Sequence, residues 1–188
     1  MLETVGLSTG TVVLAEMGDK TQLLALILAA RFHRTIPIVL GILVATVFNH
    51  SLAGLLGAWI TNLVSPETLR WLLAAGFWAM AVWMLIPDKE DGGSLENPWM
   101  KRLGVFGATL ITFFLAEMGD KTQIATVALA AHTGQTLSVV LGTTLGMLIA
   151  DVPAVYLGDK VCTNLPMKWI HLACALLFVG LGVAALLF

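Results

Sequence analysis

A nine-residue segment occurs twice without change in this sequence, at residues 14–22 and 115–123, and it limits what the chain can fold into. Each copy reads LAEMGDKTQ and lies within an apolar stretch. The two stretches are long enough to cross a bilayer, which takes about 20 residues of helix. Charged groups inside a membrane are costly and usually mark an ion or substrate pathway. The copies, here called the first and second motif, therefore predict a membrane protein with a buried charged site.

Composition also favours a helical membrane protein. Of the 188 residues, 58% are hydrophobic and 12% are charged, whereas soluble domains have about 25% charged residues. The apolar runs are continuous rather than alternating, which favours helices over a barrel. Cys162 and Cys174 lie in or beside apolar stretches, where packing is a commoner role than a disulfide or a thiolate metal site. The net charge of −2 comes with no basic patch, so no nucleic-acid partner is expected.

Hydropathy predicts six membrane spans. The Pro-, Gly- and acid-rich segment 88–102 divides the chain and is predicted to be a solvated linker. We therefore expect an all-α integral membrane protein, with a first three-helix repeat at 1–87 and a second at 103–188. The approximate bounds of the six spans are 5–30, 36–60, 69–86, 103–131, 137–156 and 169–188.

The repeat extends beyond the motifs. Leu40–Gly41 recurs 101 positions later as Leu141–Gly142, and the same step takes His50 to Asp151. Three spans in each half would make the second half enter the membrane from the opposite side. The sequence thus predicts inverted repeats, with the site at their interface near the middle of the bilayer.

Basic residues outside the motifs predict the orientation of the chain. Seven of them fall in the loops after spans one, three and five, whereas the opposite side has only Arg70. The positive-inside rule then places the linker in the cytoplasm and both termini outside. The N-terminus lacks the positive region of a secretory signal, so the first apolar run is expected to be retained. The seven residues are Arg31, Arg34, Lys89, Lys101, Arg102, Lys160 and Lys168.

The motif side chains suit a divalent cation. On a helix, Glu16 and Asp19 would share one face, and the second motif would repeat the arrangement. The intervening glycines would permit close approach or local unwinding, and an unwound turn would expose further carbonyl oxygens. A cage built only of oxygen atoms suits Ca²⁺, Mn²⁺ or Mg²⁺. The predicted ligands are Glu16, Asp19, Gln22, Glu117, Asp120, Gln123 and Asp151.

Other residues are expected to support the site. Lys20 and Lys121 are predicted to pair with carboxylates when the site is empty, the alternative being that they extend to an aqueous vestibule. Met17 and Met118 could offer a thioether that favours Mn²⁺, although packing is the commoner role. Four more side chains complete this supporting set: Thr21, Thr122, Asn49 and His50.

Crowded carboxylates imply coupling between metal and protons. They cannot all ionise in a low dielectric without a cation present, so metal entry would displace protons. A site that faces one side at a time would then give metal–proton antiport, with no bound cofactor and no enzymatic activity. The alternatives are a channel with a carboxylate selectivity ring, an intramembrane acid–base enzyme and a membrane subunit whose buried charges only dock helices. The symmetric motif argues against the enzyme, because catalysis usually needs unlike groups in unlike roles.

Both motifs resemble those of a membrane family with a duplicated Glu-x-Gly-Asp-(Lys/Arg)-(Thr/Ser) pattern. This family includes the Golgi calcium/manganese–proton exchangers of eukaryotes and bacterial manganese exporters. Residues 16–21 and 117–122 match the pattern in full, and the six-span plan covers the whole chain. The resemblance implies exchange of a cation for H⁺, with the four motif carboxylates as the ion-binding groups. The short linker is similar to the bacterial branch, which implies a multi-pass protein of the bacterial inner (plasma) membrane that exports Mn²⁺ or Ca²⁺.

Overall fold

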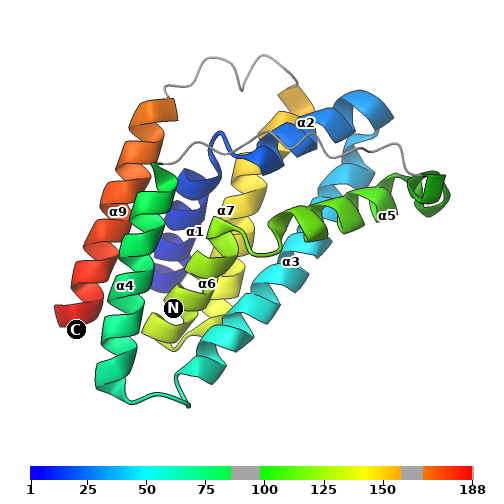
Figure 1. Ribbon diagram of the computed structural model, residues 1–188. Helices are drawn as coiled ribbons and strands as arrows, with labels where there is room; N and C mark the ends of the chain where they lie inside the picture. Colours follow the sequence, from blue (N-terminus) through cyan, green and yellow to red (C-terminus); the bar gives the residue numbers. More distant parts are fainter. Residues whose placement is uncertain (86–97, 158–166, 188) are drawn as a thin grey trace.

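The computed structural model describes residues 1–85, 98–157 and 167–187, and in these ranges all regular structure is helical (Figure 1). The all-α prediction is therefore confirmed. Predicted linker positions 88–97, Lys160 and Cys162 lie outside the described residues. The helices are α1 (Leu2–Glu16), α2 (Lys20–Phe32), α3 (Thr35–Ile60), α4 (Pro66–Met84), α5 (Pro98–Glu117), α6 (Lys121–Thr133), α7 (Thr136–Leu157) and α9 (Met167–Leu187).

Two helices are long and apolar enough to cross a membrane by themselves. They are α3 and the Thr136–Tyr156 part of α7. The bent pair formed by Leu103–Glu117 and Lys121–Thr133 gives a third candidate span if it is counted as one. The described residues thus provide two to three candidate spans by length and composition, which is fewer than the six predicted.

The first and fourth predicted spans are not continuous helices, because each breaks inside its motif. The chain becomes extended at Met17 (ψ 114°) and passes through Gly18 at φ 80°, a left-handed conformation that favours glycine. The second motif breaks in the same place, with Gly119 at φ 75°, and its two helices meet at 70°. The prediction that Glu16 and Asp19 share one helix face is therefore wrong, whereas the anticipated local unwinding is confirmed.

The helices of one half pack against those of the other. Helix α1 lies along α7, and α5, the counterpart of α1, lies along α3, the counterpart of α7. In the same way, α2 contacts α7, and its counterpart α6 contacts α3. Helices α4 and α9 form a pair at one side of the bundle (Figure 1). The folded halves are consequently interleaved rather than separate.

Glycines let two of these helix pairs approach closely. A Cβ added at Gly41 of α3 would lie 3.0 Å from the carbonyl oxygen of Phe106 on α5. A Cβ added at Gly142 of α7 would lie 2.6 Å from the carbonyl oxygen of Val5 on α1. Since both members of the second pair are the counterparts of the first, the same backbone contact is built twice. The hydroxyl of Thr9 donates to the Gly142 carbonyl at 2.9 Å and reinforces the second one.

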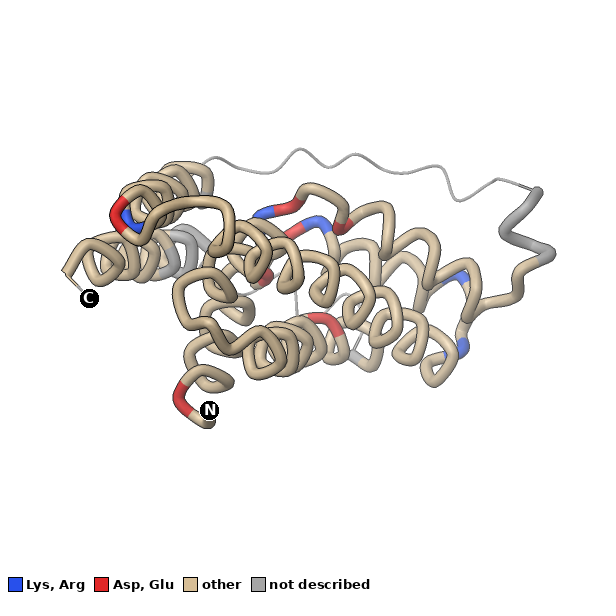
Figure 2. Tube along the Cα trace, turned by 90° about the horizontal axis from the view of Figure 1, so that it is seen from below, with Lys and Arg blue, Asp and Glu red and all other residues tan. Residues whose placement is uncertain are grey.

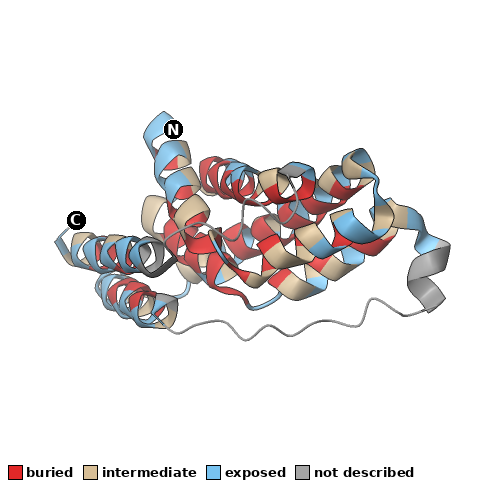
Figure 3. Ribbon diagram, turned by 90° about the horizontal axis from the view of Figure 1, so that it is seen from above, coloured by how far each residue is buried: buried red, intermediate tan, exposed pale blue. Residues whose placement is uncertain are grey.

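Buried residues line the interior of the bundle, and exposed apolar residues cover much of its outside (Figure 3). One core cluster centres on Phe77 of α4 and Phe178 of α9, whose rings stack at 6.3 Å. A second cluster joins α2, α3 and α5 through Leu28, Ile42 and Phe113. Apolar outer surfaces of this kind suit a lipid environment.

Candidate cation site

Each motif folds into the same capped helix break. The carboxylate of Asp19 caps α2 by accepting the Lys20 backbone N–H at 2.7 Å, and the Gln22 side-chain oxygen accepts the Gly18 N–H at 2.9 Å. In the second motif the corresponding distances are 2.7 Å and 2.7 Å. The motif therefore specifies a local structure, a short loop that ends one helix and begins the next.

The glutamates close the preceding helices and point back to the loop that follows them. Glu16 ends α1, and its Oε2 accepts the hydroxyl of Thr21. Glu117 ends α5, and the equivalent contact from Thr122 is 3.5 Å long. Both glutamates are fully buried. They lie beside the N-termini of α2 and α6, where the helix dipole favours negative charge.

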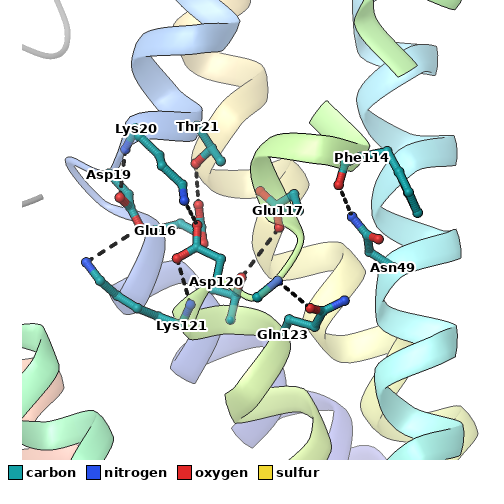
Figure 4. A network of polar contacts seen from close by, with 12 residues as sticks. Glu16, Asp19, Lys20, Thr21, Asn49, Phe114, Glu117, Asp120, Lys121 and Gln123 are labelled. Carbon is teal, nitrogen blue, oxygen red and sulfur yellow. Dashed lines mark hydrogen bonds and ion pairs between the residues drawn. The ribbon is translucent and has the colours of Figure 1, made fainter. Parts of the chain in front are cut away.

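The lysines pair with the aspartates of the opposite motif. The Nζ atom of Lys20 lies 3.0 Å from Oδ2 of Asp120, and the Nζ atom of Lys121 lies 3.8 Å from Oδ2 of Asp19 (Figure 4). The two breaks therefore lie next to each other, and Figure 2 shows acidic and basic positions gathered in one part of the molecule. The predicted pairing of lysine with carboxylate is present, and it crosses between the halves.

The two ion pairs differ in how far the surrounding protein covers them. The side chain of Lys20 is 39% exposed and that of Asp120 is 3% exposed. Lys121 and Asp19 are each only 2% exposed. An identical sequence is therefore held in two environments, so the described conformation is asymmetric at the charged centre.

Several carboxylate oxygens at this centre are buried and accept no hydrogen bond from the described residues. Apart from the aspartate oxygens that face the lysines, they are Oε1 of Glu16, Oε1 of Glu117 and both oxygens of Asp151. Asp151 is a near neighbour of Glu16, Asp19 and Glu117. Buried carboxylates without hydrogen bonds are costly unless a proton or a cation neutralises them. The arrangement is thus suited to binding positive charge.

Asp151 lies in the C-terminal half of α7 and is fully buried, and its counterpart His50 is likewise buried in the C-terminal half of α3. The side-chain amide of Gln22 donates to the carbonyl of Ala150 at 2.9 Å, which ties the first motif to α7 next to Asp151. In α3, the side-chain amide of Asn49, next to His50, donates to the carbonyl of Phe114 in α5 at 3.1 Å. Neither carbonyl was anticipated from the sequence, because backbone partners in other helices leave no signal in residue type.

Not every predicted site residue reaches the centre. Met118 is 59% exposed, whereas Met17 is half-buried. The side chain of Gln123 is half-buried and hydrogen-bonds within its own motif. In the ranges that the structure describes, no three acidic, histidine or cysteine side chains are close enough to hold one metal ion. The cage of four carboxylates is therefore not assembled in this conformation, and the assignment of ligands stays a prediction.

The fold and the charged centre define an α-helical membrane protein with buried charged residues in its interior. Residues 4–92 and 105–188 match the family described as "Divalent cation/proton antiporter GDT1", and the chain belongs to that family. Family membership confirms the resemblance noted in the two motifs, and with it the expected class, a membrane transporter that exchanges a divalent cation for protons.

Individual relatives cover nearly the whole chain. A Vibrio cholerae protein named "Putative manganese exporter" is 46% identical over 100% of this chain and 92% of its own length. The GDT1-like protein 5 of Oryza sativa is 30% identical over 96% of this chain and 92% of its own length. The GDT1-like protein 5 of Arabidopsis thaliana is 27% identical over 93% of this chain and 91% of its own length. No solved structure matches the chain.

Proposed function

We propose that this protein exports Mn²⁺ across the bacterial inner membrane in exchange for protons, with Ca²⁺ as the alternative ion. The observation that carries the proposal is the crossed pairing of Lys20 with Asp120 and of Lys121 with Asp19 inside an apolar bundle. The similarity to the Vibrio cholerae protein, by its name a manganese exporter, supports the choice of ion.

The proposed site lies between two inverted three-helix repeats, at 1–87 and 103–188, joined by a cytoplasmic linker at 88–102. Equivalent helices exchange partners between the halves, which supports a two-fold relation. The broken helices support the same plan, since transporters of this type bind ions at discontinuous spans near the midplane. In the proposed arrangement there are six spans and both termini face outward.

The proposed ligands are the four motif carboxylates and Asp151, with Gln22 and Gln123 contributing side-chain oxygens. Mn²⁺ and Ca²⁺ both favour oxygen ligands of this kind. The buried carboxylate oxygens for which the described residues show neither a hydrogen bond nor an ion pair belong to Glu16, Glu117 and Asp151. These three residues would carry protons when no metal is bound, so exchange of metal for protons requires no additional group.

Proteoliposomes with an internal pH dye test the proposal. Addition of Mn²⁺ outside should drive protons in the opposite direction, and Glu16→Gln or Glu117→Gln should abolish this signal. Glu3→Gln is a matched control, because Glu3 is an exposed acid in the first turn of the same helix as Glu16. Metal uptake without proton movement would contradict antiport, and a larger signal with Ca²⁺ would reassign the ion.

A further inference from the structure

Lys20 occupies a position that a metal ion would need. Its ammonium nitrogen lies 3.0 Å from Oδ2 of Asp120, a predicted metal ligand. A divalent ion bound to the same oxygen would lie about 2.0–2.6 Å from it. Two cations that close to one another and to a single carboxylate would repel strongly. Binding of metal at Asp120 therefore requires the ammonium of Lys20 to move away.

The Lys20 side chain can move away from its aspartate, whereas the Lys121 side chain cannot. The 39% exposure of the Lys20 side chain shows that the protein does not enclose it, so its flexible four-carbon stem can swing away from Asp120. The Lys121 side chain is 2% exposed, so the surrounding protein holds its ammonium at the buried centre. The two lysines occupy the same place in identical motifs, yet only one pair can open in this conformation.

We propose that Lys20 is a tethered counter-ion that competes with the transported metal for Asp120, while Lys121 remains on Asp19 as a fixed clamp. This inference rests on the function proposed above and adds a role for a residue that is not itself a ligand. Lys20 leaves Asp120 when the metal arrives and returns when it departs. Its return lowers the affinity of the site and helps to release the ion.

Two substitutions at Lys20 should shift metal affinity in opposite directions. Lys20→Gln removes the competitor, so the KM for Mn²⁺ should fall by about fivefold, the effect of one half-exposed ion pair. Turnover should fall as well, because release of the ion is no longer assisted. Lys20→Arg keeps the charge and can contact Asp120 with two N–H groups, so KM should rise. A merely structural lysine would be replaced better by arginine than by glutamine, and neither change would lower KM.

Amine labelling gives a second test, whose main comparison, with and without Mn²⁺, is made on the wild-type protein. Acetylation of proteoliposomes, followed by mass spectrometry, should modify Lys20 and leave Lys121 protected. Saturating Mn²⁺ should raise labelling of Lys20 severalfold, because its ammonium has left Asp120, without raising labelling of Lys121. In Glu117→Gln, where the site is expected not to bind metal, Mn²⁺ should leave labelling of Lys20 unchanged.

The outcomes separate this inference from the function on which it rests. Wild-type exchange of Mn²⁺ for protons, combined with labelling of Lys20 that Mn²⁺ does not raise, would overturn the role of Lys20 alone. An unchanged or higher KM in Lys20→Gln would do the same. Failure of the wild-type protein to exchange metal for protons would instead overturn the proposed function.

Discussion

The unequal burial of the two ion pairs predicts unequal effects for one chemical change made at equivalent positions. Asp19→Asn and Asp120→Asn each remove one negative charge and little else. Each asparagine keeps a side-chain oxygen that can cap the following helix, a position where Asn and Asp are similarly favoured. The caps at Lys20 and Lys121 should therefore survive, and the two variants differ mainly in the lysine that loses its carboxylate.

The magnitudes follow from exposure. Asp19→Asn leaves the Lys121 ammonium at 2% exposure without the charge that faced it, which should cost about 3–5 kcal/mol of unfolding free energy. Asp120→Asn leaves Lys20 at 39% exposure, where the side chain is free to turn outward, so the loss should be about 1 kcal/mol or less. The expected difference between the variants is thus about 2–4 kcal/mol.

Unfolding in mixed detergent micelles, followed by circular dichroism, would measure both free energies. The double variant Asp19→Asn/Lys121→Met should recover much of the loss, since both buried charges are then absent. Equal losses in the two single variants, or a larger loss in Asp120→Asn, would refute the reasoning. Such a result would mean that the difference in burial between the pairs does not govern their energies.

Three further predictions concern packing, backbone conformation and transport. Gly142→Ala should destabilise the protein by about 1–3 kcal/mol in thermal unfolding, because the added Cβ would lie 2.6 Å from the Val5 carbonyl oxygen. Gly6→Ala is the control, since a Cβ there would meet no atom within 4 Å. Gly119→Ala meets no atom within 4 Å, so it should lose only the cost of φ 75°, about 1–2 kcal/mol in the same assay. Asp151→Asn should remove Mn²⁺-driven proton movement in proteoliposomes while the circular dichroism spectrum stays unchanged; full activity would exclude Asp151 from the site.

The helical class and the duplicated motif could be predicted from sequence because both depend on local pattern. Long apolar runs form helices in a membrane, and two segments of identical sequence are expected to adopt the same local structure. The helix break at the motif was also within reach. Asp19 with Gln22 three positions later is a helix-start signature, and Gly18 before it is a common end signal. The continuous apolar run around the motif concealed these signals.

The crossed ion pairs could not be predicted in the same way. A lysine next to an aspartate in sequence gives no indication that it will pair with the aspartate of the other copy. That pairing depends on the angle at each break and on how α2 and α6 pack against the opposite half. The difference in exposure between Lys20 and Lys121 is harder still to predict, because the two motifs are identical in sequence and differ only in the residues and helices around them.

The crossed pairs have a consequence for how the molecule assembles. Lys20 and Lys121 each find their carboxylate in the other half of the chain. A half produced alone would insert a lysine and several acids into the bilayer without the charges that complement them. Two halves made as separate polypeptides, however, carry everything needed to satisfy each other. The chain is thus equivalent to a heterodimer of half-transporters fused end to end, and each half acts as the assembly partner of the other.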